Sequence, residues 1–486
     1  MSDHANTPDL TKPSGEDPHL SRQLSNRHIQ LIAIGGAIGT GLFMGSGKTI
    51  SLAGPSVIFV YMIIGFMLFF VMRAMGELLL SNMAYKSFSD FAADLLGPWA
   101  GFFTGWTYWF CWIVTGIADV IAISGYFKYW WPGLAAWIPA LLTIAALLLL
   151  NLPTVRAFGE TEFWFALIKI IAIVSLIVVG IVMVVSGFTA PNGATSGIDN
   201  LWNDGGMFPT GFMGFVAGFQ IAVFAFVGIE LVGTTAAEAK DPEKNLPKAI
   251  NSIPIRVLLF YVVALTVIIA VTPWREISAD KSPFVAMFTL AGLGIAASVI
   301  NFVVLTSAAS SANSYLLHLA HGVRPCAGGR RTEGPRQAEL TQGPRERLMF
   351  SCIFLLASLI LLFSGDSVIE AFTVVTTISA LLFMFVWTII LASYMVYRKR
   401  RPHLHEASKF KMPGGIVMCW VVLAFFVFIL WALTTKDDTL QALLVTPIWF
   451  VVLGIAWAII RRRPAHRARY DAFRSELDAS RQNGEK

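Results

Sequence analysis

The sequence predicts an all-α polytopic membrane protein with 12 transmembrane helices. Of its 486 residues, 56% are hydrophobic and only 14% are charged, and the mean hydropathy is +0.67. A soluble domain carries roughly 25% charged residues. Apolar runs of about 20 residues, the length that crosses a bilayer, recur along the whole chain. We therefore expect no separate soluble domain.

The apolar runs fix the expected topology. They lie at 29–49, 54–72, 99–125, 134–152, 164–187, 212–236, 253–272, 290–314, 349–364, 369–396, 412–433 and 443–461. An even number of spans puts both termini on one side. The positive-inside rule makes that side the cytoplasm, because it then carries all but six of the 36 Lys and Arg residues. Five of the six face outward and the last lies within a span: Lys48, Lys128, Arg275, Lys281, Lys436 and Lys169.

Outside the spans, the chain offers little that suggests another function. Residues 1–28 are polar and read as a disordered cytoplasmic tail, and 462–486 as a second cytoplasmic tail. The net charge of +6 reflects topology and contact with anionic lipid, and no nucleic acid partner is expected. The cysteines are too scattered for a disulfide or a zinc site: Cys111, Cys326, Cys352 and Cys419.

The first span contains an unusual run of glycines. Gly35, Gly36, Gly39 and Gly41 occupy four of seven positions, and each costs a helix roughly 1 kcal/mol relative to alanine. A helix break in a membrane survives only where protein or a water-filled cavity satisfies the freed backbone groups. The run therefore indicates a binding site for a small polar solute. Close helix packing is the alternative, and the spacing alone leaves both open.

The sixth span repeats this irregularity. Gly228 and Glu230 interrupt an apolar run that begins at Phe224. The first and sixth spans occupy equivalent positions in two halves of five helices each. Interrupted helices at corresponding positions of two repeats indicate a transport site near the middle of the membrane.

The two interruptions suit a zwitterionic amino acid. A half-helix that begins at the first break presents free N–H groups to a carboxylate, and freed carbonyls at the second accept from an ammonium group. We expect the substrate to contact Ile38, Gly39, Thr40, Gly41, Ala225, Phe226, Val227, Gly228 and Glu230. No metal and no cofactor are needed. An enzyme would need catalytic groups converging at a membrane face, and none do, so we expect a transporter.

Three further side chains have predicted roles. Lys169 lies a few residues inside the fifth span, where desolvation favours loss of its proton, so it can couple substrate movement to proton movement. The alternative is a lysine that snorkels to the cytoplasmic surface. Glu230 is a structural acceptor at the second break or a titrating group. Glu77 is a salt-bridge or gate residue, and Phe226 is a gate over the substrate.

The chain resembles the amino acid transporter family of the amino acid–polyamine–organocation superfamily. The resemblance rests on the sequences at 35–43, 53–77, 105–109, 226–230 and 238–242 and on Lys169. It implies a LeuT-like fold within 29–461, with helices 1–5 and 6–10 as inverted repeats and helices 11–12 peripheral. It also implies proton symport of D-serine, D-alanine, glycine and L-alanine by alternating access. A permease for larger neutral or aromatic amino acids is the alternative.

Residues 315–347 depart from this resemblance. The family continues the eighth helix with a Ser-Thr-Ser-Arg-Met-like stretch and then Phe-Gly-Leu-Ala. Here the chain runs from Tyr315 to Arg330 through a glycine-rich basic sequence in which His318, His321 and Cys326 lack metal-ligand spacing. Codons permitted for these residues spell both family stretches when read one base later. We therefore hypothesise a pair of compensating frameshifts, which resequencing the gene tests. If the sequence is genuine, the product is transport-impaired.

Overall fold

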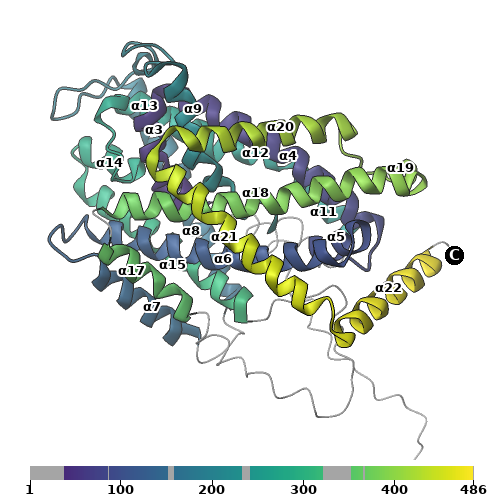
Figure 1. Cartoon of the computed structure of the whole chain (residues 1–486). Coiled ribbons are helices and arrows are strands. Elements are labelled where there is room, and N and C mark those ends of the chain that lie inside the picture. The colour runs from purple at the N-terminus through teal and green to yellow at the C-terminus, as the bar shows by residue number, and fades with distance from the viewer. Residues whose placement is uncertain are drawn as a thin grey trace, which may run out of the picture.

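A computed structural model describes residues 38–85, 87–151, 158–231, 241–320, 352–364 and 367–484 (Figure 1). Within these ranges the regular structure is helical, apart from one isolated bridge between Thr189 and Thr195. The predicted tail at 1–28 lies outside the described residues. So does most of the atypical segment 315–347, of which only the backbone of 315–320 is described.

The first half of the chain forms helices that follow the predicted apolar runs. Most residues before the sixth span belong to α2 (Thr40–Phe43), α3 (Gly45–Ala53), η1 (Gly54–Ser56), α4 (Val57–Ser81), α5 (Phe88–Leu96), α6 (Pro98–Phe127), α7 (Trp137–Asn151), α8 (Phe158–Val185) and η3 (Ile198–Leu201). A turn at Gly54, where φ is +60°, separates α3 from α4. Glycine suits this turn because other residues disfavour positive φ.

The second half contains shorter segments as well as long helices. They are α9 (Gly211–Ala222), η4 (Val223–Phe226), α11 (Pro242–Asn251), α12 (Ile253–Val257), η5 (Leu258–Val263), α13 (Ala264–Val271), η6 (Trp274–Glu276), α14 (Pro283–Leu290), α15 (Gly294–Ala320), α17 (Ala357–Ser364), α18 (Val368–Arg400), α19 (Pro402–Ala407), α20 (Gly415–Ala432), η7 (Leu433–Thr435), α21 (Asp437–Ile460) and α22 (Pro464–Gly484). The element η5 is a turn of π-helix.

The described residues contain eight helical runs that are long and apolar enough to cross a membrane, which agrees with a multi-pass protein. Three shorter apolar helices lie at Trp137–Leu150, Gly211–Phe226 and Cys352–Phe363. Helical residues occur in each of the twelve predicted intervals. The two counts differ because the first two predicted spans form one continuous run, Gly45–Ser81, and because the three shorter helices are the fourth, sixth and ninth predicted spans.

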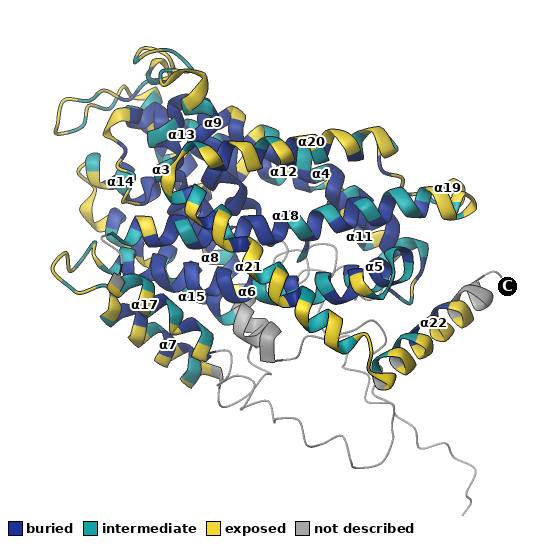
Figure 2. Ribbon diagram, viewed as in Figure 1, coloured by how far each residue is buried: buried dark blue, intermediate teal, exposed yellow. Residues whose placement is uncertain are grey.

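Helices α6 and α18 run through the middle of the molecule and pack against each other, whereas α20 lies along one side and α21 crosses in front of α18 (Figures 1 and 2). The central helices are largely buried. The outward side of α21 exposes apolar side chains along its length, including Leu444, Val451 and Ile455. Apolar exposure of this extent fits a helix that faces lipid rather than water.

One end of the molecule is held together by polar contacts around α5. The Arg401 guanidinium donates to the Asp94 carboxylate at 2.7 Å, and the Tyr85 hydroxyl donates to the same carboxylate. Burial and the nearby Asp94 raise the pKa of Tyr85 to about 12, so its hydroxyl stays protonated and remains a donor. The tail predicted at 462–486 forms α22, which contacts α5 through a 3.2 Å hydrogen bond from the Tyr470 hydroxyl to the Ala93 carbonyl.

Candidate functional site

The described part of the first apolar segment begins with two non-helical residues inside the glycine run. Gly39 has an extended backbone, with φ −131° and ψ −166°, and the helix begins at Thr40. Ile38 and Gly39 are therefore non-helical, whereas Thr40 and Gly41 form the first turn of α2. The remaining glycines of the run, Gly35 and Gly36, lie outside the described residues. The N-terminal end of a helix thus lies within this span, as the glycine content indicates.

The sixth segment is interrupted where the sequence predicts it. The α-helix α9 tightens into the 3₁₀ turn η4, which ends at Phe226. Val227 is extended, with ψ 136°, and Gly228 has a φ of +92°. A residue with a side chain rarely adopts that φ, so glycine is the residue that lets the chain turn here. The helical hydrogen-bond ladder therefore ends before Glu230.

The two interruptions lie against each other. A Cβ atom added to Gly41 would lie 2.6 Å from the Ala225 Cα and 2.8 Å from the Ala225 N. Carbon atoms in contact normally stay about 3.5–4.0 Å apart, so an alanine at position 41 would force the two backbones apart. The first-span glycine therefore serves close backbone approach, which is one of the two alternatives that the spacing left open.

An aromatic cluster covers the second interruption. The Phe226 ring stacks on Tyr261 with centroids 5.0 Å apart and 15° between planes, and Tyr61 packs against both rings. The Tyr261 hydroxyl donates a 2.8 Å hydrogen bond to the Ala225 carbonyl. Tyr261 belongs to the π-helical turn η5, and π-bulges often occur at functional sites. One carbonyl predicted to receive the substrate ammonium is thus already paired with a side chain.

A buried carboxylate approaches the first interruption. The Thr40 hydroxyl donates a 2.6 Å hydrogen bond to Asp119 Oδ1, from the first span to α6. Asp119 is 1% exposed, and its Oδ2 atom has no hydrogen-bond partner among the described residues. A buried carboxylate oxygen left in this state is costly unless a ligand, a proton or water satisfies it.

Lys169 lies in the same region of the molecule. Its side chain is 1% exposed, its Nζ atom lies 3.4 Å from Ser311 Oγ on α15, and it interacts electrostatically with Asp119. A lysine that snorkels to the surface would expose its ammonium group. The ammonium group of Lys169 instead points into the protein, which favours the first of the two interpretations of this residue.

The comparisons with known proteins decide the family. The family model described as amino acid permease matches residues 28–469. The chain belongs to the amino acid permease family. It is 66% identical over 460 residues to the D-serine/D-alanine/glycine transporter of Escherichia coli K12, covering 93% of this chain and 96% of the relative.

More distant relatives carry similar names. The chain is 51% identical over 450 residues to the amino-acid permease AapA of Bacillus subtilis, covering 92% of this chain and 97% of the relative. It is 40% identical over 441 residues to the probable threonine/serine transporter YbxG of B. subtilis, covering 90% and 95%. This permease is therefore a membrane transporter and not an enzyme.

Glu230 of the permease is buried close to the second interruption. Its side chain is 0% exposed, and its Oε1 atom lies 3.5 Å from the Tyr108 hydroxyl of α6. The Oε2 atom has no hydrogen-bond partner among the described residues. Two buried carboxylates thus accompany the interruptions. Asp119 of α6 lies beside the first, and Glu230 of the sixth span lies beside the second.

Glu77 lies apart from both interruptions. Its carboxylate accepts from the Met412 N–H at 2.7 Å and the Tyr394 hydroxyl at 3.0 Å, and lies 2.5 Å from His405 Nδ1. These partners come from α18, α19 and the segment before α20. Glu77 therefore joins the end of α4 to three later elements, as a salt-bridge residue would, and it does not contact the predicted substrate positions.

Sequence reasoning missed Asp119 and Tyr261. Asp119 carries a signal that could have found it, because it is a carboxylate within the predicted span 99–125, and intramembrane charges are usually functional. The sequence contains no such signal for Tyr261, because a tyrosine in an apolar segment is usually a packing residue. Its contact with Ala225 depends on how α4, α9 and η5 meet.

Proposed function

We propose that this permease imports glycine, D-alanine, D-serine and L-alanine by proton symport. The observation that carries the proposal is the meeting of two helix interruptions, where Gly41 lies against Ala225. Main-chain N–H groups of residues 38–41, at the start of α2, bind the substrate carboxylate, and main-chain carbonyls at Ala225–Val227 bind its ammonium group. Gly228 provides the turn, and Glu230 is the structural hydrogen-bond acceptor at this second interruption.

The proposed architecture follows from the same pairing. Spans 1–5 and 6–10 form two inverted repeats of a LeuT-like fold, and the last two spans are peripheral. The exposed apolar side of α21, which crosses in front of α18, supports the peripheral assignment (Figure 1). Both termini lie in the cytoplasm of a bacterial inner membrane, because the basic segments at 398–401 and 461–463 then lie on the inner side.

Small substrates are favoured over aromatic ones by the packing around the break. Phe226, Tyr61 and Tyr261 are all buried and already fill the space beside the Ala225 carbonyl. A large substrate side chain there would displace at least one of these rings from its partners. Phe226 serves as a gate because it is the ring that belongs to the interrupted span.

Proton coupling is assigned to Lys169 and Asp119. Lys169 is buried, and charge in that environment is expensive unless it is paired. Its electrostatic interaction with Asp119, which also contacts Thr40, links the lysine to the substrate-binding end of the first span. Loss of a proton from Lys169 would alter the charge beside Thr40 and so the affinity for a zwitterion.

Counterflow in proteoliposomes tests the proposal. Labelled glycine and D-alanine are expected to enter vesicles that contain unlabelled glycine, and tryptophan in tenfold excess should not compete. Competition by tryptophan would favour a permease for larger neutral or aromatic amino acids. Absence of any counterflow would indicate the transport-impaired product expected if residues 315–347 are genuine, and a variant with the restored reading frame separates that case from a wrong substrate.

A further inference from the structure

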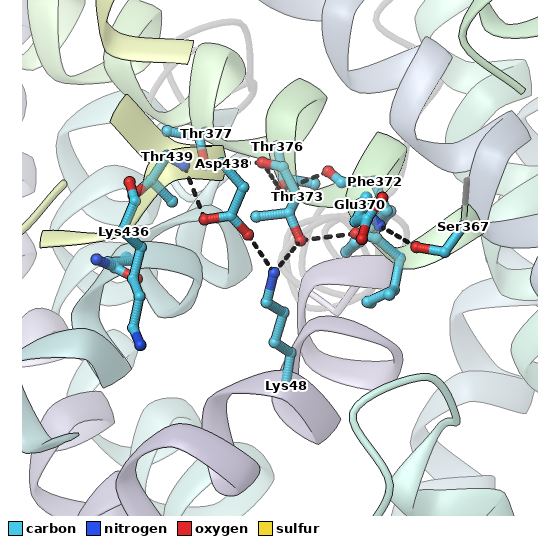
Figure 3. A network of polar contacts seen from close by, with 12 residues as sticks. Lys48, Ser367, Glu370, Phe372, Thr373, Thr376, Thr377, Lys436, Asp438 and Thr439 are labelled. Atoms are coloured by element: carbon cyan, nitrogen blue, oxygen red, sulfur yellow. Dashed lines mark hydrogen bonds and ion pairs between the residues drawn. The ribbon is translucent and has the colours of Figure 1, made fainter. Parts of the chain in front are cut away.

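The turn between the two peripheral helices is tied to the first span by charge. Lys48 on α3 donates to Asp438 Oδ2 at the start of α21, with 2.5 Å between the atoms, and to Thr373 Oγ1 of α18 at 3.0 Å (Figure 3). The side chains are 17% and 27% exposed for Lys48 and Asp438, so the pair is partly shielded from solvent. It joins residues that are 390 positions apart in the chain.

The sixth span reaches the same turn. Gln220 on α9 is buried, and its Nε2 atom donates to the Ala432 carbonyl at 2.8 Å and to Thr435 Oγ1 at 2.9 Å. We call residues 432–438 the peripheral turn. Each interrupted span thus sends one polar side chain to the peripheral turn, Lys48 from the first and Gln220 from the sixth.

The peripheral turn is itself well fixed. The Thr439 hydroxyl donates to the Leu433 carbonyl at 2.8 Å, and the Thr439 N–H donates to Asp438 Oδ1 at 2.8 Å. Asp438 also occupies the first turn of α21, where the helix dipole favours a carboxylate. The carboxylate that receives Lys48 is therefore held in place before the lysine binds it.

The halves of the interrupted spans that carry Lys48 and Gln220 pack as one unit. A Cβ atom added to Gly218 of α9 would lie 2.9 Å from the Ala53 Cβ of α3, and one added to Gly45 would lie 3.0 Å from Ile221. Spacing this close leaves little freedom for α3 and α9 to move relative to each other. A motion of either half would move both, and would strain both contacts with the peripheral turn.

We propose that Lys48, Gln220 and the peripheral turn position the outer halves of the interrupted spans, so that the outer side opens only when the Lys48–Asp438 pair separates. The inference rests on the proposed function and its topology. The peripheral helices then take part in transport, because α3 and α9 must separate from the peripheral turn when the outer side opens. Asp438 and Lys48 act through the position of these halves and do not contact substrate.

Transport kinetics of single and double variants test the proposal. Lys48→Gln and Asp438→Asn each remove the ion pair, which favours the outward-open state. The apparent KM for external glycine should fall about two- to fivefold, because more of the protein is competent to bind from outside. The maximum rate of net uptake should fall as well, because the outer side must close again in each cycle.

Matched controls lie beside each residue. Lys436→Gln and Asp437→Asn remove the same charges from exposed positions of the same turn, and should leave both parameters unchanged. The exchanged pair Lys48→Asp with Asp438→Lys should recover the wild-type KM. A merely structural contact would lower the amount of folded protein without lowering KM. An unchanged KM in both single variants would overturn the proposal.

A distance measurement separates this inference from the choice of substrate. Spin labels at Leu52→Cys on α3 and Thr434→Cys in the peripheral turn, with the four native cysteines replaced by alanine, report the separation of the two elements. Pulsed electron–electron double resonance should give one main distance between the labels with the ion pair intact, and an added longer component with Asp438→Asn. Identical distributions would overturn the inference, whether or not glycine is transported.

Discussion

The Thr40 hydroxyl donates a 2.6 Å hydrogen bond to the carboxylate of Asp119, joining the first turn of the interrupted first span to the centre of α6. Both residues are almost fully buried. This contact places a carboxyl group, which is negatively charged when it loses its proton, beside the helix N-terminus that is proposed to bind the substrate carboxylate. Because like charges repel at this range, the protonation of Asp119 and the binding of substrate are expected to depend on each other.

Removal of the Thr40 hydroxyl tests this coupling. Thr40→Val leaves a buried carboxylate without its donor, which costs on the order of 1–3 kcal/mol, and should lower glycine uptake at least tenfold. Thr40→Ser keeps the donor and should recover most of the activity. Uptake of labelled glycine across an imposed pH gradient is the measurement.

Thr115→Val is the control for this pair of variants. It removes another buried hydroxyl, on α6, one that contacts Ser379 at 2.8 Å. It should lower thermal stability and leave the KM for glycine unchanged. An equal loss of uptake in Thr115→Val and Thr40→Val would contradict a specific role for the Thr40–Asp119 contact.

Gly41→Ala is expected to destabilise the protein. Its new Cβ atom would lie 2.6 Å from the main chain at Ala225, and backbone cannot move aside as a flexible side chain can. Overpacking of this kind costs roughly 1–3 kcal/mol. The melting temperature in detergent should fall by several degrees.

Gly39→Ala provides the comparison, because a Cβ atom there would have no heavy atom of the described residues within 4 Å apart from its chain neighbours. Because no described residue obstructs a methyl group there, its melting temperature should stay close to that of the wild type. If Gly41→Ala melts at the same temperature as Gly39→Ala, the two interruptions do not approach as closely as described.

Lys169→Ala should abolish accumulation driven by a pH gradient and leave some exchange of labelled for unlabelled glycine. Exchange needs only binding and alternating access, whereas accumulation needs the proton. Lys128→Ala removes an exposed lysine at the end of α6 and should retain both activities. Full accumulation by Lys169→Ala would remove this residue from the coupling mechanism.

Tyr261→Phe should lower the apparent KM for glycine about two- to tenfold. The variant keeps the ring that stacks on Phe226 and removes only the hydroxyl that occupies the Ala225 carbonyl. A substrate ammonium would then bind that carbonyl without displacing a competitor. Uptake kinetics at fixed pH measure the change, and a raised KM would show that the hydroxyl helps to hold the site rather than competing for it.

The sequence by itself determined the multi-pass helical class and the place where the sixth span is interrupted, and it marked the stretch of the first span in which a helix begins. Apolar runs and glycine content act locally, because the cost of a glycine in a helix and the length of a span do not depend on distant residues. The helix start at Thr40 lies within the glycine run, and η4 ends at Phe226, two residues before the predicted interruption at Gly228. Lys169 was found as a charge within a span for the same reason.

Only the tertiary structure decided which side chains meet at those interruptions. Asp119 reaches Thr40 across 79 residues, Tyr261 reaches Ala225 from another helix, and Lys48 reaches Asp438 from the opposite end of the chain. Contacts of this kind depend on how rigid helices pack in three dimensions. The local sequence around each residue therefore does not predict its partner. The choice of partners, and with it the chemistry of the site, was therefore fixed by packing.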